Sequence, residues 1–161
     1  MMKKMSDKQY RKWYLKLNQR ECFICQNYSQ FLIKEYKYWA WIDKIRAYVR
    51  YDTMLIPKRH ITCFTDLTIE ELQEWNQMVY SDIFNIFRKA HVRGSHGNLV
   101  DRMAVMLHVR DKYVEKGKYK DRPEHLHFHL TPDHDHFFDS VLTRKTQKIN
   151  VVEKLRPYIG L

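Results

Sequence analysis

Three histidines alternate with three apolar residues in the segment 125–130, which reads His-Leu-His-Phe-His-Leu. Successive side chains of a β-strand point to opposite faces, so this spacing predicts a strand with the histidines on one face and the apolar side chains in a core. Imidazole titrates closest to neutral pH, so a row of imidazoles can supply a nucleophile, a proton donor and a metal ligand. A surface strand or an adventitious metal-binding tract is the alternative for these residues taken alone.

Other motifs precede this segment in the chain, namely Cys22-Phe-Ile-Cys25, Trp39-Ala-Trp-Ile-Asp43 and Leu55-Ile-Pro-Lys-Arg-His60. Together with the alternating histidines, these motifs resemble those of the histidine-triad family of nucleotide hydrolases and transferases, in the family's order. The resemblance covers about residues 21–133. It implies an α+β histidine-triad fold, with an antiparallel sheet of about five strands and a long helix packed on it. We expect residues 1–161 to form one domain.

The resemblance implies roles for the three histidines. In the family the middle histidine attacks phosphorus and forms a covalent nucleotidyl-histidine, which water or another acceptor then releases, and this role falls to His127. His129 would flank the reacting phosphate, and His125 would bind metal. The implied activity is hydrolysis or transfer of a nucleoside monophosphate at the α-phosphate of a phosphoramidate, a dinucleoside polyphosphate or a similar ester. A purine nucleotide is the expected substrate.

Cys22 and Cys25 have the spacing that lets two thiolates bind one tetrahedral metal ion. In zinc-containing members of the family the remaining ligands are the histidine of Pro-Lys-x-His and the first histidine of the triad, here His60 and His125. The resemblance therefore implies a structural zinc site. A thioredoxin-like redox pair is the alternative, but such a pair lies at a helix N-terminus after a buried strand, whereas a Gln-Asn turn signal and a strand follow here.

The family's nucleoside pocket is formed in part by the segment that matches Trp39–Asp43. By position Asp43 would bind the ribose hydroxyls, with Trp41 and Ile42 beside it, although a solvated turn residue is the alternative for Asp43. The next loop departs from the family, because residues 44–52 replace its usual Pro and Gly-His.

The family's phosphate contacts are also replaced. Its Gln and Ser/Thr directly before the triad are absent, and Arg122 could supply a bidentate phosphate contact instead. Its asparagine near the end of the preceding strand is absent too, and His108 and Arg110 stand close to that position. These departures support one rival reading, a non-catalytic nucleotide-binding or interaction module.

Apolar spacing predicts the secondary structure. Strands are expected around residues 31–33, 38–42 and 54–56, as an antiparallel meander, and over 99–109. A capping-box pattern at Thr68 and Glu71 predicts a long amphipathic helix that ends near Gly94. Helices are also expected over residues 6–19 and in the basic tail 144–161, where a break is expected near Pro157. The first helix and the tail are additions to the family's motifs.

The formal net charge is +10, which favours an anionic partner such as a nucleotide or a nucleic acid. Several basic residues gather in the loop that enters the triad, namely Lys112, Lys116, Lys118, Lys120 and Arg122. A second rival reading is therefore a hydrolase that removes AMP from the 5′ end of a nucleic acid.

Three cysteines make no disulfide framework, and no apolar run follows Lys3 and Lys4 as it would in a secretory signal. No apolar stretch approaches the ~20 residues needed to span a bilayer. We therefore expect a cytoplasmic protein without a membrane partner. We also expect a homodimer, because the apolar strand 99–109 and the long helix before it would otherwise leave a sheet edge unpaired.

Overall fold

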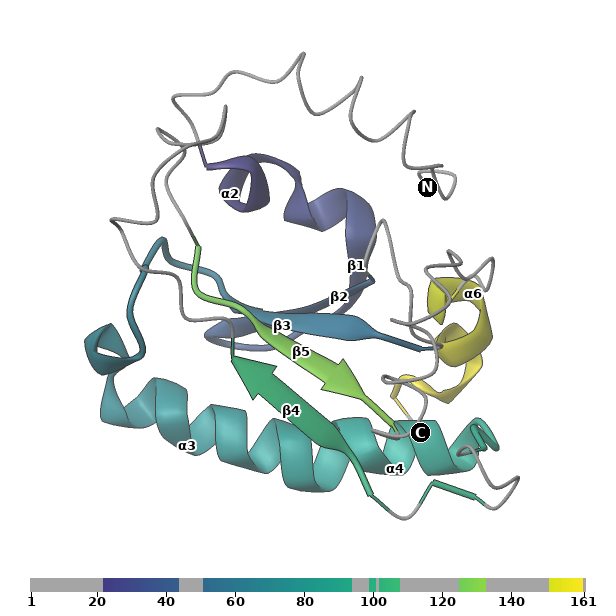
Figure 1. Cartoon of the computed structure of the whole chain (residues 1–161). Coiled ribbons are helices and arrows are strands. Elements are labelled where there is room, and N and C mark those ends of the chain that lie inside the picture. The colour runs from purple at the N-terminus through teal and green to yellow at the C-terminus, as the bar shows by residue number, and fades with distance from the viewer. Residues whose placement is uncertain are drawn as a thin grey trace, which may run out of the picture.

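The computed structural model describes residues 22–43, 51–93, 99–100, 102–107, 125–132 and 151–160. Their centre is an antiparallel sheet of five strands in the order β1-β2-β3-β5-β4 (Figure 1). The strands are β1 (Leu32–Glu35), β2 (Trp39–Asp43), β3 (Thr53–Pro57), β4 (Ala104–Leu107) and β5 (Phe128–Thr131). The predicted α+β fold and the predicted meander of the first three strands are confirmed.

Strand β2 lies inside the sheet and is buried along its whole length. Its side chains alternate between two apolar clusters, so that Trp39 and Trp41 enter the larger one while Ala40 and Ile42 enter the smaller one. A strand buried on both faces needs apolar residues at every position, which explains the unbroken Trp-Ala-Trp-Ile run.

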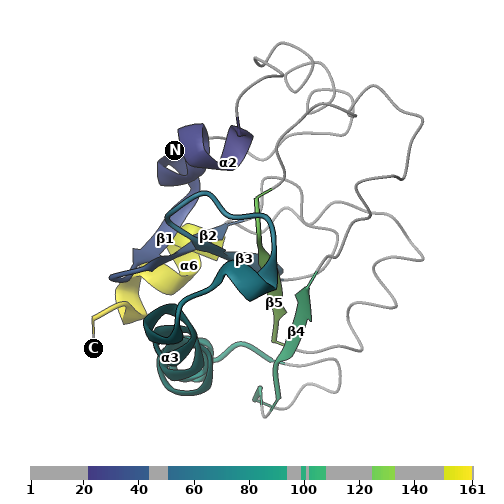
Figure 2. The same ribbon diagram turned by 90° about the vertical axis from the view of Figure 1, so that its left-hand side faces the viewer.

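A continuous helical segment crosses the face of the sheet that carries the larger cluster (Figures 1 and 2). It consists of α3 (Ile69–Gln77), a π-helical segment η3 (Met78–Ile83) and α4 (Phe84–Lys89). The predicted capping box is present: the Thr68 hydroxyl accepts from the backbone N–H of Glu71 at 3.2 Å, and the Glu71 carboxylate accepts from the backbone N–H of Thr68 at 2.8 Å. The long helix is therefore confirmed, although its regular part ends at Lys89 rather than near Gly94.

The opposite face of the sheet is covered by a short helix, α2 (Phe23–Asn27), and a 3-10 turn, η1 (Tyr28–Phe31) (Figure 1). They pack on the smaller cluster of buried residues, whose members are Phe31, Ala40, Ile42 and Ile56. The sheet thus lies between two helical layers, and its strands contribute side chains to both.

The C-terminal segment contains α6 (Val151–Leu155), which buries Val151, Val152 and Leu155 in the larger cluster. A 3-10 turn, η4 (Arg156–Tyr158), follows it. The predicted break in this helix near Pro157 is confirmed, because proline has no N–H to continue the α-helical hydrogen bonds.

Within the strand predicted over 99–109, Leu99 forms an isolated bridge with Arg93, and β4 begins at Ala104, which pairs with Thr131 of β5. Residues 101, 108 and 109 of that prediction lie outside the described residues. The predicted helix over 6–19, Arg110 and the basic loop that contains Arg122 lie outside the described residues. Among the described residues, no helix is both long and apolar enough to cross a membrane.

Candidate metal and histidine site

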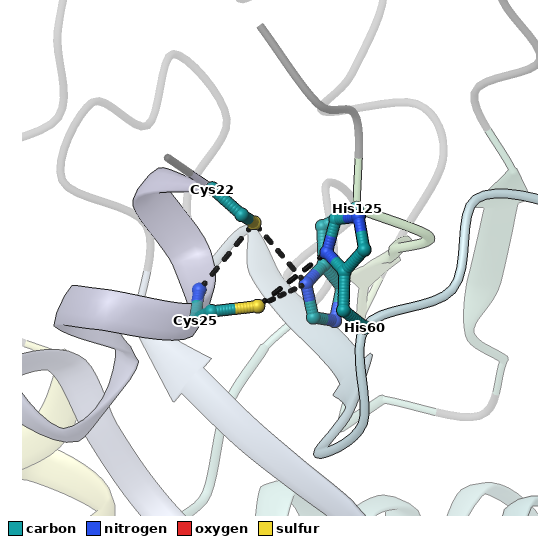
Figure 3. A group of neighbouring side chains, drawn as sticks. All are labelled: Cys22, Cys25, His60 and His125. Carbon is teal, nitrogen blue, oxygen red and sulfur yellow. Dashed lines mark hydrogen bonds between the residues drawn. The ribbon is translucent and has the colours of Figure 1, made fainter. Parts of the chain in front are cut away.

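Four side chains that are distant in the sequence meet beside α2: Cys22, Cys25, His60 and His125 (Figure 3). Their ligand atoms all lie within 4.8 Å of one another. Nδ1 of His125 is 3.4 Å from Sγ of Cys22 and 3.3 Å from Sγ of Cys25, and Nδ1 of His60 is 3.4 Å from Sγ of Cys25. The sequence predicted this set of four, and the structure brings all of them together.

These distances suit a tetrahedral zinc ion. With Zn–S near 2.3 Å and Zn–N near 2.0–2.1 Å, a tetrahedron places sulfur and nitrogen about 3.5 Å apart. The observed Sγ–Nδ1 separations of 3.3 and 3.4 Å are close to that value. The two thiols and two imidazoles therefore fit a zinc ion in donor type and in spacing.

The four residues come from α2, from the loop after β3 and from the segment before β5. Cys22 is the N-cap of α2, where its Sγ accepts from the backbone N–H of Cys25 at 3.5 Å. This helix contradicts the predicted Gln-Asn turn, because Gln26 and Asn27 continue the helical turn that begins at Phe23. Cys22 and Cys25 therefore do lie at a helix N-terminus, as the two cysteines of a thioredoxin-like redox pair would. Metal binding is favoured instead, because His125 lies against both sulfurs and His60 lies against that of Cys25.

The loop that carries His60 is tied to the long helix. Arg59 donates from Nε to Glu71 at 2.6 Å and from a second nitrogen at 2.8 Å, and Glu71 is the buried capping-box residue of α3. A bidentate pair of this kind fixes orientation as well as distance. The pair therefore holds Arg59, the residue directly before His60, against the first turn of α3.

His125 is the buried member of the cluster, with 5% of its surface exposed. Its Nε2 donates to the carbonyl oxygen of Pro57 at 2.8 Å, and the backbone N–H of Leu126 donates to the carbonyl of Ile61 at 2.7 Å. The hydrogen bond at Nε2 leaves Nδ1 as the ligand nitrogen and fixes the plane of the ring.

Burial is the main cause of the pKa shifts of His125 and Cys25. It lowers the pKa of His125 to about 4, with further lowering from the neighbouring His60 and His127, although the hydrogen bond to Pro57 opposes this. Burial also raises the pKa of Cys25 to about 11, together with its contact with Cys22. His125 is thus neutral at pH 7, the form that binds metal, whereas Cys25 keeps its proton at pH 7 unless a bound cation displaces it.

His127 and His129 continue the row. Nδ1 of His127 is 2.8 Å from the carbonyl oxygen of His125, and the rings of His127 and His129 lie with their centroids 5.3 Å apart. Strand β5 begins only at Phe128, so the first two histidines precede the regular strand instead of lying within it as predicted. The apolar half of the prediction is confirmed, because Leu126, Phe128 and Leu130 are all buried in the larger cluster.

Sequence reasoning missed Asp52, which is buried with 3% of its surface exposed. Its Oδ1 lies 3.1 Å from Nδ1 of His129, and both side chains are 4% exposed. The sequence offered no periodic signal for this residue, since it stands in the loop that departs from the family.

The predicted nucleotide-binding residues of β2 are all buried. Trp41 has no exposed surface, donates from its indole nitrogen to the Thr53 hydroxyl at 2.8 Å and lies edge-on to Phe87. Ile42 is 2% exposed, and Asp43 is 8% exposed at the end of the strand. The structure thus places Trp41 and Ile42 in the core, and nucleotide contact by these residues stays a prediction.

No protein-family model matches the sequence, and no curated protein sequence matches it. Solved structures match it through their fold. A HIT family protein from Bacillus anthracis str. 'Ames Ancestor' is 18% identical with a TM-score of 0.52, over 70% of this chain and 72% of that chain. A zinc-bound histidine triad family protein from Mycobacterium smegmatis is 22% identical with a TM-score of 0.54, over 87% of this chain and 94% of that chain.

A uridylyltransferase mutant is also similar, with 18% identity and a TM-score of 0.57, over 91% of this chain. The match covers 49% of that protein, so this chain spans about half of its length. At these identities the likeness concerns the arrangement of the backbone. With the five-stranded sheet, the long helix on one face and the histidines at β5, it establishes that this chain has the histidine-triad fold.

Proposed function

We propose that this chain is a histidine-triad nucleotide hydrolase or nucleotidyl transferase that acts at an α-phosphate through a nucleotidyl intermediate on His127. The observation that carries the proposal is the fixed ring of His127. Its Nδ1 donates to the carbonyl oxygen of His125, so the lone pair resides on Nε2. A neutral imidazole with a fixed ring and a defined lone pair is what nucleophilic attack on phosphorus requires.

In the first step Nε2 of His127 forms a bond to the α-phosphorus while the bond from phosphorus to the leaving group breaks, and the leaving group keeps the electron pair. In the second step water or another acceptor attacks the same phosphorus, and the P–N bond breaks to return the imidazole. The neighbouring ring of His129 lies beside the nucleophile, where it can contact the phosphate in both steps. The +10 charge of the chain favours the approach of an anionic substrate.

We further propose that Cys22, Cys25, His60 and His125 hold a structural zinc ion. Two thiolates and two imidazoles complete a tetrahedron, so a zinc ion here would stabilise the fold and leave no position for substrate. The site would join α2, the loop after β3 and the segment that enters β5. The backbone carbonyl that anchors His127 belongs to His125, so metal binding would also steady the nucleophile.

A turnover screen tests the activity directly. Purified protein is offered nucleoside phosphoramidates, dinucleoside polyphosphates and 5′-adenylated oligonucleotides, and the His127→Ala variant is assayed beside it. We expect His127→Ala to lose turnover by several orders of magnitude while its affinity for a nucleoside monophosphate changes little, because attack and ground-state binding use different contacts. His91→Ala is the control, since His91 is exposed and lies beyond the end of α4.

Mass spectrometry of the wild type, quenched without acid, should find a nucleotide adduct on His127. An active His127→Ala variant would exclude the covalent mechanism. A wild type that is inert towards every substrate would favour the non-catalytic binding module instead.

The net charge favours a second candidate, the nucleic-acid 5′-adenylate hydrolase. Phosphate contacts release counterions, so oligonucleotide affinity should fall steeply as salt is raised. Turnover of the adenylated oligonucleotide well above that of the small nucleotides would favour this candidate, whereas single-stranded DNA binding no tighter than about millimolar at low salt would remove it.

A further inference from the structure

Asp52 is an acidic residue placed where acids are rarely found. It is 3% exposed, directly before β3, and its Oδ1 lies 3.1 Å from Nδ1 of His129. Removing a carboxylate from water costs several kcal/mol unless a partner compensates for the lost hydration. The pair is itself enclosed, since both side chains are 4% exposed. The core therefore contains a polar pair at a position where two apolar side chains would have a smaller desolvation cost.

The backbone that delivers Asp52 is strained. Tyr51 has φ of 58°, in the left-handed region that a bulky residue seldom occupies. Strain of this kind costs about 1–3 kcal/mol and persists only where the surrounding structure enforces it. Here the enforcing contacts are visible, because Tyr51 is 5% exposed, lies edge-on to Phe87 of α4 at 6.4 Å and carries Lys154 of α6 over its ring. The core thus holds the turn that aims Asp52 at the sheet.

The residue that Asp52 meets is next to the nucleophile. His129 lies opposite Met54 of β3 and Met106 of β4 in the sheet, and its ring centroid is 5.3 Å from that of His127. The carboxylate accepts from Nδ1 of His129, so Nδ1 carries a hydrogen and Nε2 is the ring nitrogen on the other side from Asp52. An acid that holds one nitrogen of an imidazole defines both the tautomer and the direction of the other nitrogen.

We propose that Asp52 is a positioning residue that fixes the ring orientation and the Nδ1–H tautomer of His129 for the reaction at His127. The proposal rests on the proposed function. It adds to that function a residue from the loop between β2 and β3, which acts on the third histidine of the row. Asp52 acts through His129 and contacts no substrate in this assignment.

The test has two independent readouts, and the first needs no activity. Nitrogen-15 NMR of histidine-labelled wild-type protein reports which ring nitrogen of His129 carries hydrogen, with His129→Gln used to assign the signal. We expect the Nδ1–H form in the wild type. In Asp52→Asn, whose amide can either donate or accept, we expect this preference to weaken. A wild-type His129 in the Nε2–H form would overturn the proposal, whether or not the protein turns over any substrate and whether or not the variant folds.

The second readout is kinetic. We expect Asp52→Asn to lower kcat on the order of 100-fold with KM little changed, because misdirecting a group beside the nucleophile costs about that much. Asp82→Asn is the matched control, since Asp82 is also a paired acid but contacts Lys34 and Tyr36 on the helix side. A kcat for Asp52→Asn within twofold of the wild type would overturn the proposal while leaving the activity of His127 intact. An inert wild type with the Nδ1–H form would refute the proposed function and the catalytic purpose of Asp52 together.

Discussion

His125 makes contacts through both of its ring nitrogens and through its carbonyl oxygen. Nδ1 faces the two cysteine sulfurs, Nε2 donates to the carbonyl of Pro57, and its own carbonyl accepts from His127. One residue therefore links the metal-binding cluster, strand β3 and the proposed nucleophile. A change at His125 should disturb both the cluster and the histidine row.

The low pKa of His125 makes stability depend on pH. The folded ring, with a pKa of about 4, resists a proton that the unfolded chain accepts near pH 6.5. The contribution of His125 to the free energy of unfolding of the metal-free protein should therefore be fully present above pH 6.5. The free energy of unfolding should fall by up to about 3 kcal/mol as the pH drops to 4.

Urea denaturation in chelator between pH 7 and pH 4 measures this loss. The loss should be smaller in His125→Asn and unchanged in His91→Asn, whose histidine is exposed. An equal loss in wild type and His125→Asn would show that other groups govern the acid transition.

Residues of the site differ in how far sequence could predict them. Alternation alone was enough to predict that Leu126, Phe128 and Leu130 enter the core, because the strand period is two. Asp52 could not be found that way, since its role depends on a left-handed backbone at Tyr51 and on a partner 77 residues away. Contacts of this range leave no local pattern.

Helix α2 is an element that cannot be stable alone. Five residues form little more than one turn, and isolated helices below about 12 residues are marginal in water. Its support comes from tertiary contacts: Phe23 and Ile24 pack on the smaller cluster, and its N-cap Cys22 joins the four-residue site. Removal of a bound metal should therefore loosen α2 first.

Metal removal tests the proposed zinc. We expect about one equivalent of zinc in protein made without chelators, and Cys22→Ser should lose it together with about 2 kcal/mol or more, lowering the melting temperature by about 4–8 °C. Amide exchange should rise in residues 22–31 while residues 69–89 stay protected.

Cys63→Ser is the matched control, because Cys63 is exposed and outside the cluster. Less than half an equivalent of zinc in the wild type, with unchanged melting of Cys22→Ser, would contradict the site.

Elements with local signals were predictable and those set by packing were not. The start of α3 followed from Thr68 and Glu71, whose side chains complete the capping box within four residues. The π-helical segment Met78–Ile83 was missed, because a wider turn changes the hydrogen bonds without breaking the apolar spacing. Two consecutive residues of this segment, Met78 and Val79, are both buried in the core.

At the scale of the whole molecule, the two edges of the sheet differ. The edge strand β1 carries Lys34 and Glu35 and an irregularity in its pairing, features that discourage further strand addition. Among the strands that the structure describes, the other edge strand is β4, which reads Ala-Val-Met-Leu and in which Val105 is 37% exposed. An apolar edge without charges favours pairing with a second copy through β4.

Homodimerisation through β4 remains our prediction, and light scattering tests it. We expect about twice the chain mass of 19.9 kDa at micromolar concentration. Val105→Lys should shift the mass towards the single chain, because a buried lysine at the pairing edge opposes association.

Ile69→Lys is the control, since Ile69 is 71% exposed and belongs to α3 and not to the sheet. A wild type with the mass of one chain would remove the dimer.

The wide separation of the metal-binding residues also sets the order of events in biogenesis. Cys22 and His125 are 103 residues apart, so a ribosome has made both cysteines and His60 long before the fourth ligand emerges. Closing so long a loop has an entropic cost, which strand pairing in the sheet has to offset. A metal ion held by all four side chains would therefore be bound only after His125 has been made, and we expect metal binding to be a late step in folding, close to the pairing of β5 with the sheet.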